Sequence, residues 1–330
     1  MTNRPLYIDN LQYANWSPKL FEEMKIANLA AVHVTICYHE NFRQIVENII
    51  TWNRYIESHP NRLQSGKTGN DVREAHQSGK TAIIYGFQNC SAIEDHIGLI
   101  EVLHQLGGRF MQLSYNNQSL LATGCYESED PGITRFGRQA IREMNRVGLV
   151  VDVSHTSEKS SFDALKCSTR PIVISHANPN WWHPSKRNKS HDLIKSITSA
   201  KGMIGFSLYP HHLNNGSDCT IESFSQMIAE SANRYGIDSL GIGSDICQGQ
   251  PNSVVEWMRN GTWSKDRDYG EGSAEDSGFP EQPKWFNRIQ DFPNIKQGLY
   301  KVGFNTNEIE KIMGLNWLRF YDENFEHKEN

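Results

Sequence analysis

The chain lacks the features that mark membrane-spanning, secreted and nucleic-acid-binding proteins. Its 330 residues contain no apolar run near the roughly 18 residues that a transmembrane helix needs. The N-terminal stretch lacks the apolar core of a secretory signal. A net charge of −5, without a basic cluster interleaved with aromatic residues, argues against nucleic acid or an anionic membrane as partner. The six cysteines include no CxxC pair, so we expect reduced thiols and a cytoplasmic protein.

The chain does contain a regular series of short apolar, β-branched runs. Eight of them begin near residues 7, 30, 81, 109, 149, 171, 203 and 239. Most are continuously apolar, which is typical of strands buried on both faces of a parallel sheet. The segments between them carry apolar residues at helical spacing, and several end in glycine. This alternation predicts an α/β fold, a single (β/α)₈ barrel of the TIM type over residues 1–330; a doubly wound open sheet is the alternative.

Residues 248–294 interrupt this rhythm. The segment is rich in Gly, Pro, Asp and Trp and shows little helical or strand periodicity. We expect an irregular insertion after the eighth strand. Because loops after barrel strands emerge on the active-site face, the insertion is a candidate lid or subunit contact.

Polar side chains stand at the predicted C-terminal ends of the strands, where barrel enzymes place their chemistry. Strands five and six both end in Ser-His, giving His155 and His176, and strand eight ends in Asp245. Two histidines and a carboxylate are a common ligand set of catalytic zinc, which lowers the pKa of a bound water. The sequence therefore predicts a metal site on these three residues, in which Asp245 either binds the metal or accepts the proton.

Other strand-end residues are ambiguous. Asp152 is either a hydrogen-bonded buried carboxylate or a partner that orients a histidine ligand. The pairs His39-Glu40 and His211-His212 lie in predicted loops and are weaker candidates.

Several motifs together resemble the membrane dipeptidase family, peptidase family M19. They are "FGRQAIREMNRVGLVVDVSHTS", "PIVISHAN", "HPSKRNKSHD", "GIGSD" and "MGLNWLRF", in this order from about Asp9 to Phe320. The resemblance implies a (β/α)₈ barrel of the metal-dependent hydrolase type, usually dimeric, that cleaves dipeptides with two zinc ions bridged by a glutamate and a water. It also implies that His155 and His176 bind one zinc, that Arg187 holds the substrate carboxylate, and that Asp245 acts as acid and base.

The chain departs from this family pattern at the metal site. Leu11 and Tyr13 stand where the resemblance implies a histidine and an aspartate for the other zinc. Gln88 replaces the bridging glutamate, and Tyr115 replaces a substrate-binding histidine. Leucine offers no lone pair, and a neutral amide cannot balance the charge of two ions. We therefore expect one zinc ion rather than two, or a pocket without metal.

These observations predict a metal-dependent amide or peptide-bond hydrolase acting on a dipeptide or a small amino-acid derivative with a carboxylate. Arg187, Tyr115, Gln88 and Asn116 are the predicted substrate-binding residues. The alternatives are a catalytically inactive binding protein on the same barrel and a lyase acting on an amino-acid-like substrate, because a fold alone does not determine function. A homodimer is expected from the resemblance.

Overall fold

The computed structural model describes residues 4–262 and 264–325, and its centre is a parallel β-barrel. The strands pair in the order β1-β2-β4-β5-β6-β7-β8-β9, and the short β3 pairs with β4 beside this path. Their bounds are β1 (Tyr7–Gln12), β2 (Leu29–Cys37), β3 (Leu63–Ser65), β4 (Thr81–Phe87), β5 (Gly108–Gln112), β6 (Val150–Asp152), β7 (Val173–Ile174), β8 (Met203–Phe206) and β9 (Leu240–Ile242). Each of the eight predicted runs contains one strand of the barrel.

The barrel nearly closes between its first and last strands. The N–H of Asp245 donates to the carbonyl of Leu11 at 3.0 Å, and the N–H of Tyr13 donates to the carbonyl of Ile246 at 3.0 Å. These contacts join the C-terminal ends of β1 and β9, beside the predicted site residue Asp245. The TIM-type fold expected from the sequence is confirmed.

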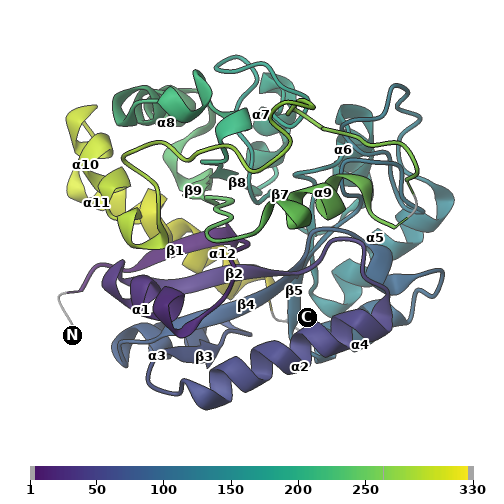
Figure 1. Ribbon diagram of the computed structural model, residues 1–330, viewed down its shortest axis with the longest axis horizontal. Coiled ribbons are helices and arrows are strands. Elements are labelled where there is room, and N and C mark those ends of the chain that lie inside the picture. The colour runs from purple at the N-terminus through teal and green to yellow at the C-terminus, as the bar shows by residue number, and fades with distance from the viewer. Residues whose placement is uncertain (1–3, 263, 326–330) are drawn as a thin grey trace.

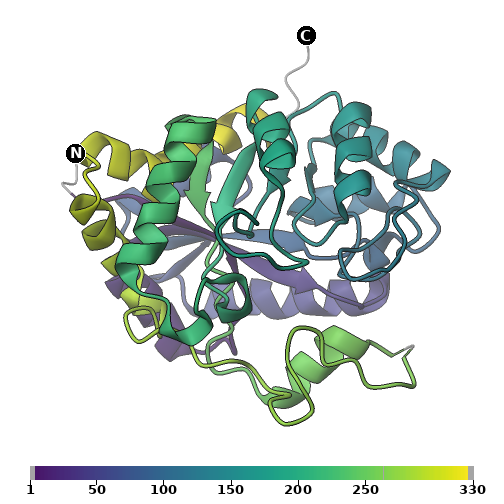
Figure 2. The same ribbon diagram turned by 90° about the horizontal axis from the view of Figure 1, so that it is seen from above.

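Helices surround the strands, as Figures 1 and 2 show from two directions. They are α1 (Pro18–Ile26), α2 (Phe42–Ser58), α3 (Gly69–Gln77), α4 (Leu99–Gln105), α5 (Arg135–Val147), α6 (Glu158–Cys167), α7 (His191–Ser199), α8 (Ile221–Tyr235), α9 (Asn252–Asn260), α10 (Asn294–Lys301), α11 (Thr306–Glu310) and α12 (Asn316–Asn324). Several begin at a side chain that accepts a backbone N–H, such as Asn41 before α2 and Thr134 before α5. Gly148 ends α5 with φ 87°, the left-handed conformation that glycine adopts readily.

The C-terminal "MGLNWLRF" motif closes the barrel floor rather than the site. Gly314 approaches β1 so closely that a Cβ atom there would lie 2.4 Å from the carbonyl oxygen of Leu6. The Trp317 indole donates to the carbonyl of Ile242 at 3.1 Å, and Asn316 donates to that of Leu240 at 2.8 Å. These contacts fix α12 against the first and last strands.

The segment 248–294 differs in part from the irregular insertion expected. It contains α9, and its final part is core: Phe286, Ile289 and Phe292 are fully buried. Figure 2 shows the portion around α9, in light green, as a lobe outside the ring of helices. The segment is therefore both an addition to the site face and a part of the barrel packing.

No helix in the described part of the chain combines the length and the apolar character needed to cross a membrane.

Candidate active site

The predicted site residues converge at the C-terminal ends of the strands. A cavity of about 50 Å³ is lined by Gln88, Tyr115, Asn116, His155, Arg187 and Asp245. They come from the segments that follow β4, β5, β6, β7 and β9, so residues far apart in the sequence meet at one end of the barrel. His176 completes the group, because its Nε2 lies 3.0 Å from Nε2 of His155.

The two Ser-His pairs are built around one buried aspartate. Asp152 accepts the hydroxyl protons of Ser154, at 2.6 Å, and of Ser175. The Ser175 oxygen in turn lies 2.7 Å from Nδ1 of His176. Because the Ser175 proton goes to the carboxylate, its oxygen accepts the proton of His176 Nδ1. Asp152 thus combines the two roles considered for it, as a buried hydrogen-bonded carboxylate that orients His176.

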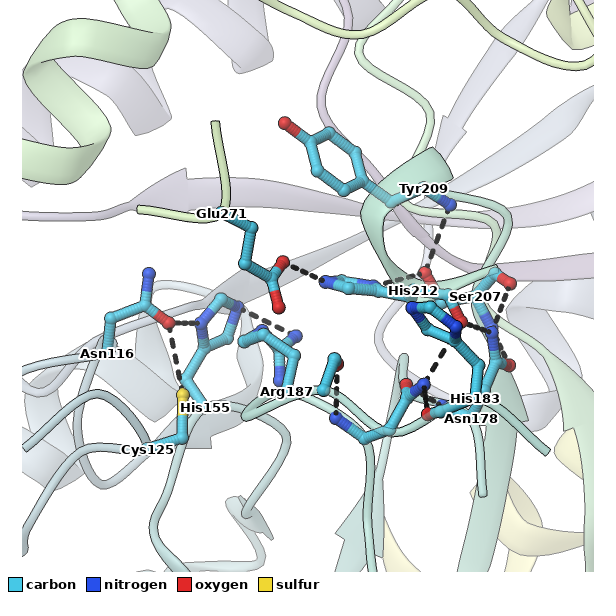
Figure 3. Close-up of polar contacts among 12 residues, drawn as sticks. Asn116, Cys125, His155, Asn178, His183, Arg187, Ser207, Tyr209, His212 and Glu271 are labelled. Atoms are coloured by element: carbon cyan, nitrogen blue, oxygen red, sulfur yellow. Dashed lines mark hydrogen bonds and ion pairs between the residues drawn. The ribbon is translucent and has the colours of Figure 1, made fainter. Parts of the chain in front are cut away.

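Asn116 fixes the other imidazole. Its Oδ1 lies 2.6 Å from Nδ1 of His155 and also accepts the thiol proton of Cys125 at 3.4 Å (Figure 3). An amide oxygen only accepts, so Nδ1 of His155 carries the proton and its Nε2 presents a lone pair. Burial lowers the pKa of both His155 and His176 well below 6.5, with the charge of Arg187 as the next cause, so both rings are neutral.

A third lone pair comes from Gln88. Its amide nitrogen donates to Thr35 Oγ1 at 2.7 Å and to the hydroxyl of Tyr38 at 3.0 Å. Its Oε1 consequently faces Nε2 of His155, at 3.0 Å. Nε2 of His155 thus faces two other acceptor atoms, Oε1 of Gln88 and Nε2 of His176, each at 3.0 Å, and a cation beside them would stabilise this group of lone pairs.

These donors are suited to a zinc ion. Two nitrogens bound to one zinc at about 2.0–2.1 Å lie roughly 3.3 Å apart in tetrahedral geometry, near the 3.0 Å between the imidazoles of His155 and His176. Imidazole nitrogens suit zinc, and the amide oxygen of Gln88 adds a third, uncharged donor. Within residues 4–262 and 264–325, no group of three or more His, Cys, Asp or Glu side chains forms a metal cluster. The site fits a metal through neutral donors.

Arg187 places a positive charge beside the two histidines. The side chain is almost completely buried, and Nη2 lies 3.3 Å from Nε2 of His155 and 3.2 Å from the carbonyl of His176. Nη1 donates to the carbonyl of Ser154. The guanidinium therefore links the two Ser-His strand ends and lines the cavity at the same time.

Asp245 faces the cavity from the turn after β9. Its backbone is left-handed, with φ 58°, a conformation that aspartate tolerates better than most residues. Burial raises the pKa of its carboxyl to about 7, while Arg187 lowers it and Asp9 raises it slightly. A carboxyl that titrates near neutrality can both accept and return a proton.

The departures from the family pattern form an aromatic wall. Tyr13 packs edge-on against Tyr38, with ring centroids 4.7 Å apart, and Tyr38 packs in the same way against Tyr115 at 4.9 Å. The Tyr115 ring lies 4.2 Å from that of His155. Leu11 is fully buried. Apolar and aromatic groups therefore stand where the resemblance implied ligands of a second ion.

The cavity has further lining residues besides the main predicted site residues. The cavity is also lined by Tyr126, Tyr209, His211, His212, Cys247, Val255, Met258, Arg259, Gly270 and Glu271. Five of them, from Val255 to Glu271, belong to the segment 248–294. The position of this segment after the eighth strand is the sequence feature that could have placed these residues at the site. His211-His212 was a weak candidate, and it does reach the cavity.

Comparison with known proteins identifies the family of this chain. The family model of membrane dipeptidase (peptidase family M19) matches residues 10–260. The dipeptidase tcpJ of Claviceps purpurea is 27% identical over 286 residues, covering 86% of this chain and 60% of that protein. This chain spans between 60% and 66% of the length of three such curated relatives.

Solved structures extend the comparison. An amidohydrolase from Pseudomonas aeruginosa superimposes with a TM-score of 0.91 at 35% identity, covering 97% of this chain and 96% of that one. A metallopeptidase from Rhodobacter sphaeroides, solved with a phosphinate mimic of L-Ala-D-Ala, shares the fold with a TM-score of 0.79 at 17% identity, covering 98% and 100%. With the matched family model, these findings establish that the chain belongs to the membrane dipeptidase family, peptidase family M19, a family of metal-dependent hydrolases.

Proposed function

We propose that this protein hydrolyses an amide or peptide bond of a small amino-acid derivative with the help of one zinc ion. The observation that carries the proposal is the convergence of Nε2 of His155, Nε2 of His176 and Oε1 of Gln88. Leu11 and Tyr13 offer no comparable donors for a second ion.

In the proposed mechanism, His155 and His176 hold the ion. Gln88, which the sequence assigned to the substrate, instead offers its amide oxygen to the ion. When bound, zinc polarises a scissile carbonyl and lowers the pKa of a water towards neutrality. Asp245 accepts the proton of the attacking water and returns it to the leaving amine, a role that its pKa of about 7 suits. We assign Asp245 to the proton rather than to the metal because it forms no ligand cluster with the histidines.

Arg187 and the surrounding polar groups bind the substrate in this proposal. The buried guanidinium faces the cavity and would attract a substrate carboxylate. Tyr115 and Asn116 orient the substrate, while Asn116 also keeps His155 in the tautomer that presents Nε2. In this proposal Asn116, the Nδ1 partner of His155, therefore serves both the metal and the substrate.

The function is tested by amide hydrolysis in protein stripped with a chelator and then supplied with zinc. A panel of L,L- and L,D-dipeptides and N-acyl amino acids covers the substrate class. We expect turnover that depends on added zinc, is lost in Asp245→Asn and in His155→Ala/His176→Ala, and is retained in the exposed control His96→Ala. Turnover that survives the double substitution would contradict the proposal.

A second candidate is a binding protein that does not use a metal. The contact of Arg187 Nη2 with His155 Nε2, at 3.3 Å, favours it, because a guanidinium already offers a proton to one of the converging lone pairs. This candidate predicts ligand binding that is unchanged by zinc or chelator, and no hydrolysis across the panel.

A further inference from the structure

Glu271 brings a carboxylate into the site from the segment 248–294. It follows Gly270, whose φ of 56° turns the chain towards the cavity. In Figure 3 the carboxylate points inward, between His155 and His212 and above Arg187. Only 19% of its side chain is exposed. Neither the barrel motifs nor the proposed mechanism uses this residue.

The surroundings of Glu271 consist of hydrogen-bond donors and cations. Tyr126, Arg187 and Arg259 line the same cavity as Glu271, and Ser185 lines the adjacent cavity with it. Burial raises the pKa of the Glu271 carboxyl, while Arg187, Tyr126, Ser185 and Arg259 lower it. Nε2 of His212 lies 3.8 Å away, too far for a hydrogen bond. This is the environment that proteins build to recognise a carboxylate.

His212 contributes shape rather than charge to this environment. Its Nδ1 lies 2.9 Å from the hydroxyl of Ser207, and its carbonyl accepts hydrogen bonds from Asn178 and Asn188, both at 3.0 Å. Burial lowers the pKa of His212 well below 6.5, so the ring is neutral. Of these neighbours, Arg187 and Arg259 supply the positive charge that faces Glu271.

Glu271 also stands between two cavities. The inner cavity, which holds the converging lone pairs, measures about 50 Å³, and an adjacent outer basin measures about 580 Å³. Tyr126, His211, Gly270 and Glu271 line both. Sites for small molecules usually measure about 300–1,000 Å³. A dipeptide-sized ligand therefore exceeds the inner cavity, and one that extends into the outer basin passes the position of Glu271.

We propose that Glu271 is a resident carboxylate: it fills a carboxylate-binding subsite formed by Arg187, Arg259, Tyr126 and Ser185, and a carboxylate-bearing ligand binds by taking its place. The subsite thereby selects carboxylates, and the part of the insertion that carries Glu271 leaves the cavity when such a ligand enters. The inference rests on the proposed function only in treating this ligand as the substrate.

The attachments of this part of the insertion permit the exchange. Arg267 pairs with Glu256 at 2.8 Å, with both side chains half exposed, and such surface pairs add little stability. Arg259 donates to the carbonyl of Ser277 at 3.0 Å. A ligand carboxylate that replaces Glu271 meets the same polar and cationic groups around the cavity, so the exchange leaves the charge of Arg187 with a carboxylate nearby.

Chemical rescue tests the subsite without metal or turnover. In Glu271→Ala the missing carboxylate leaves a space that acetate fits. We expect acetate to raise the Tm of this variant saturably, by about 2–5 °C, beyond the effect of sodium chloride at equal ionic strength. Wild type and Glu275→Ala, which removes an exposed carboxylate of the same segment, should not respond. An equal response of wild type, or an equal effect of uncharged acetamide, overturns the proposal.

Limited proteolysis of the wild-type protein gives a second test that needs no variant. Trypsin cuts after Lys265 and Arg267, which are exposed in the segment that carries Glu271. N-acetylglycine should speed cleavage there several-fold, and N-acetylglycinamide should not. Unchanged or slower cleavage with N-acetylglycine contradicts the displacement. Because neither readout involves hydrolysis, a failure here is distinguishable from a failure of the proposed function.

Discussion

At the scale of single residues, the side chain of Gln88 sets the charge of the donor group around His155 and His176. Gln88→Glu would place an anionic oxygen 3.0 Å from His155 Nε2, and the hydroxyls of Thr35 and Tyr38 can rotate to donate to the other carboxylate oxygen. We expect zinc affinity to rise on the order of tenfold or more, because a charge inside a buried site is weakly screened. Competition with a fluorescent zinc chelator measures the change.

The matched control for this prediction is Gln77→Glu, at an exposed position on α3. It adds the same charge to the chain without approaching the donors. Equal effects of Gln77→Glu and Gln88→Glu, or a lower zinc affinity in Gln88→Glu, would show that Oε1 of Gln88 does not face the ion.

Asp245 gives a prediction about stability and pH in the metal-free protein. Its pKa rises from 3.8 to about 7 on folding, chiefly through burial. Between these values the folded state binds more protons than the unfolded state, so stability falls as the pH rises. Asp245→Asn removes this penalty and should stabilise the protein above pH 7 by as much as ~4 kcal/mol, with little effect near pH 4.

Urea unfolding in EDTA at a series of pH values checks this expectation. The exposed Asp95→Asn serves as the control and should give no comparable gain above pH 7. A gain in Asp245→Asn that does not depend on pH would place the pKa of Asp245 near its ordinary value.

The sequence allowed part of the site to be predicted. His155, His176 and Asp245 could be predicted because each follows an apolar strand, and the ends of parallel strands meet at one edge of a barrel. Glu271 could not, because it lies in an irregular segment whose path depends on tertiary packing. The orientation of the Gln88 side chain could not be predicted either, because it depends on the hydroxyls of Thr35 and Tyr38, which come from the end of another strand.

At the scale of elements, two glycines make room for the end of β7. A Cβ atom at Gly205 would lie 2.1 Å from the carbonyl oxygen of Ser175, and one at Gly243 would lie 2.0 Å from the same atom. Ser175 precedes His176, so Gly205→Ala must displace the end of β7 and with it His176, a proposed metal ligand. We expect a loss of about 1–3 kcal/mol in the free energy of unfolding, together with weaker zinc binding.

Gly98→Ala is the comparison for this prediction, because a Cβ atom there meets only the exposed ring of His96. Thermal melts and zinc titrations of both variants separate local strain from a general effect of the substitution. Normal stability and zinc affinity in Gly205→Ala would contradict the tight packing at Ser175.

The elements themselves could be predicted to different degrees. The eight barrel strands followed from their apolar runs, but β3 is only three residues long and two of them are polar, so it left no pattern. The segment between β4 and β5 is helical only in part, because Glu94 adopts φ 50° and only α4 forms an α-helix there. Short elements and single left-handed residues are determined by packing rather than by periodicity.

At the scale of the whole molecule, the homodimer remains a prediction from the family resemblance. Sedimentation velocity should give a species of twice the 37.7 kDa chain mass. The distribution should stay unchanged on dilution through the micromolar range. A species of one chain mass at all concentrations would contradict the dimer.

The measurement that tests the central claim most directly is the zinc content of the purified protein, determined by mass spectrometry of the metal together with protein concentration. The account predicts about one zinc per chain, lost in His155→Ala/His176→Ala and retained in His96→Ala. Two tightly bound ions per chain, or one ion that survives the double substitution, would contradict the proposal that His155, His176 and Gln88 form a one-metal site.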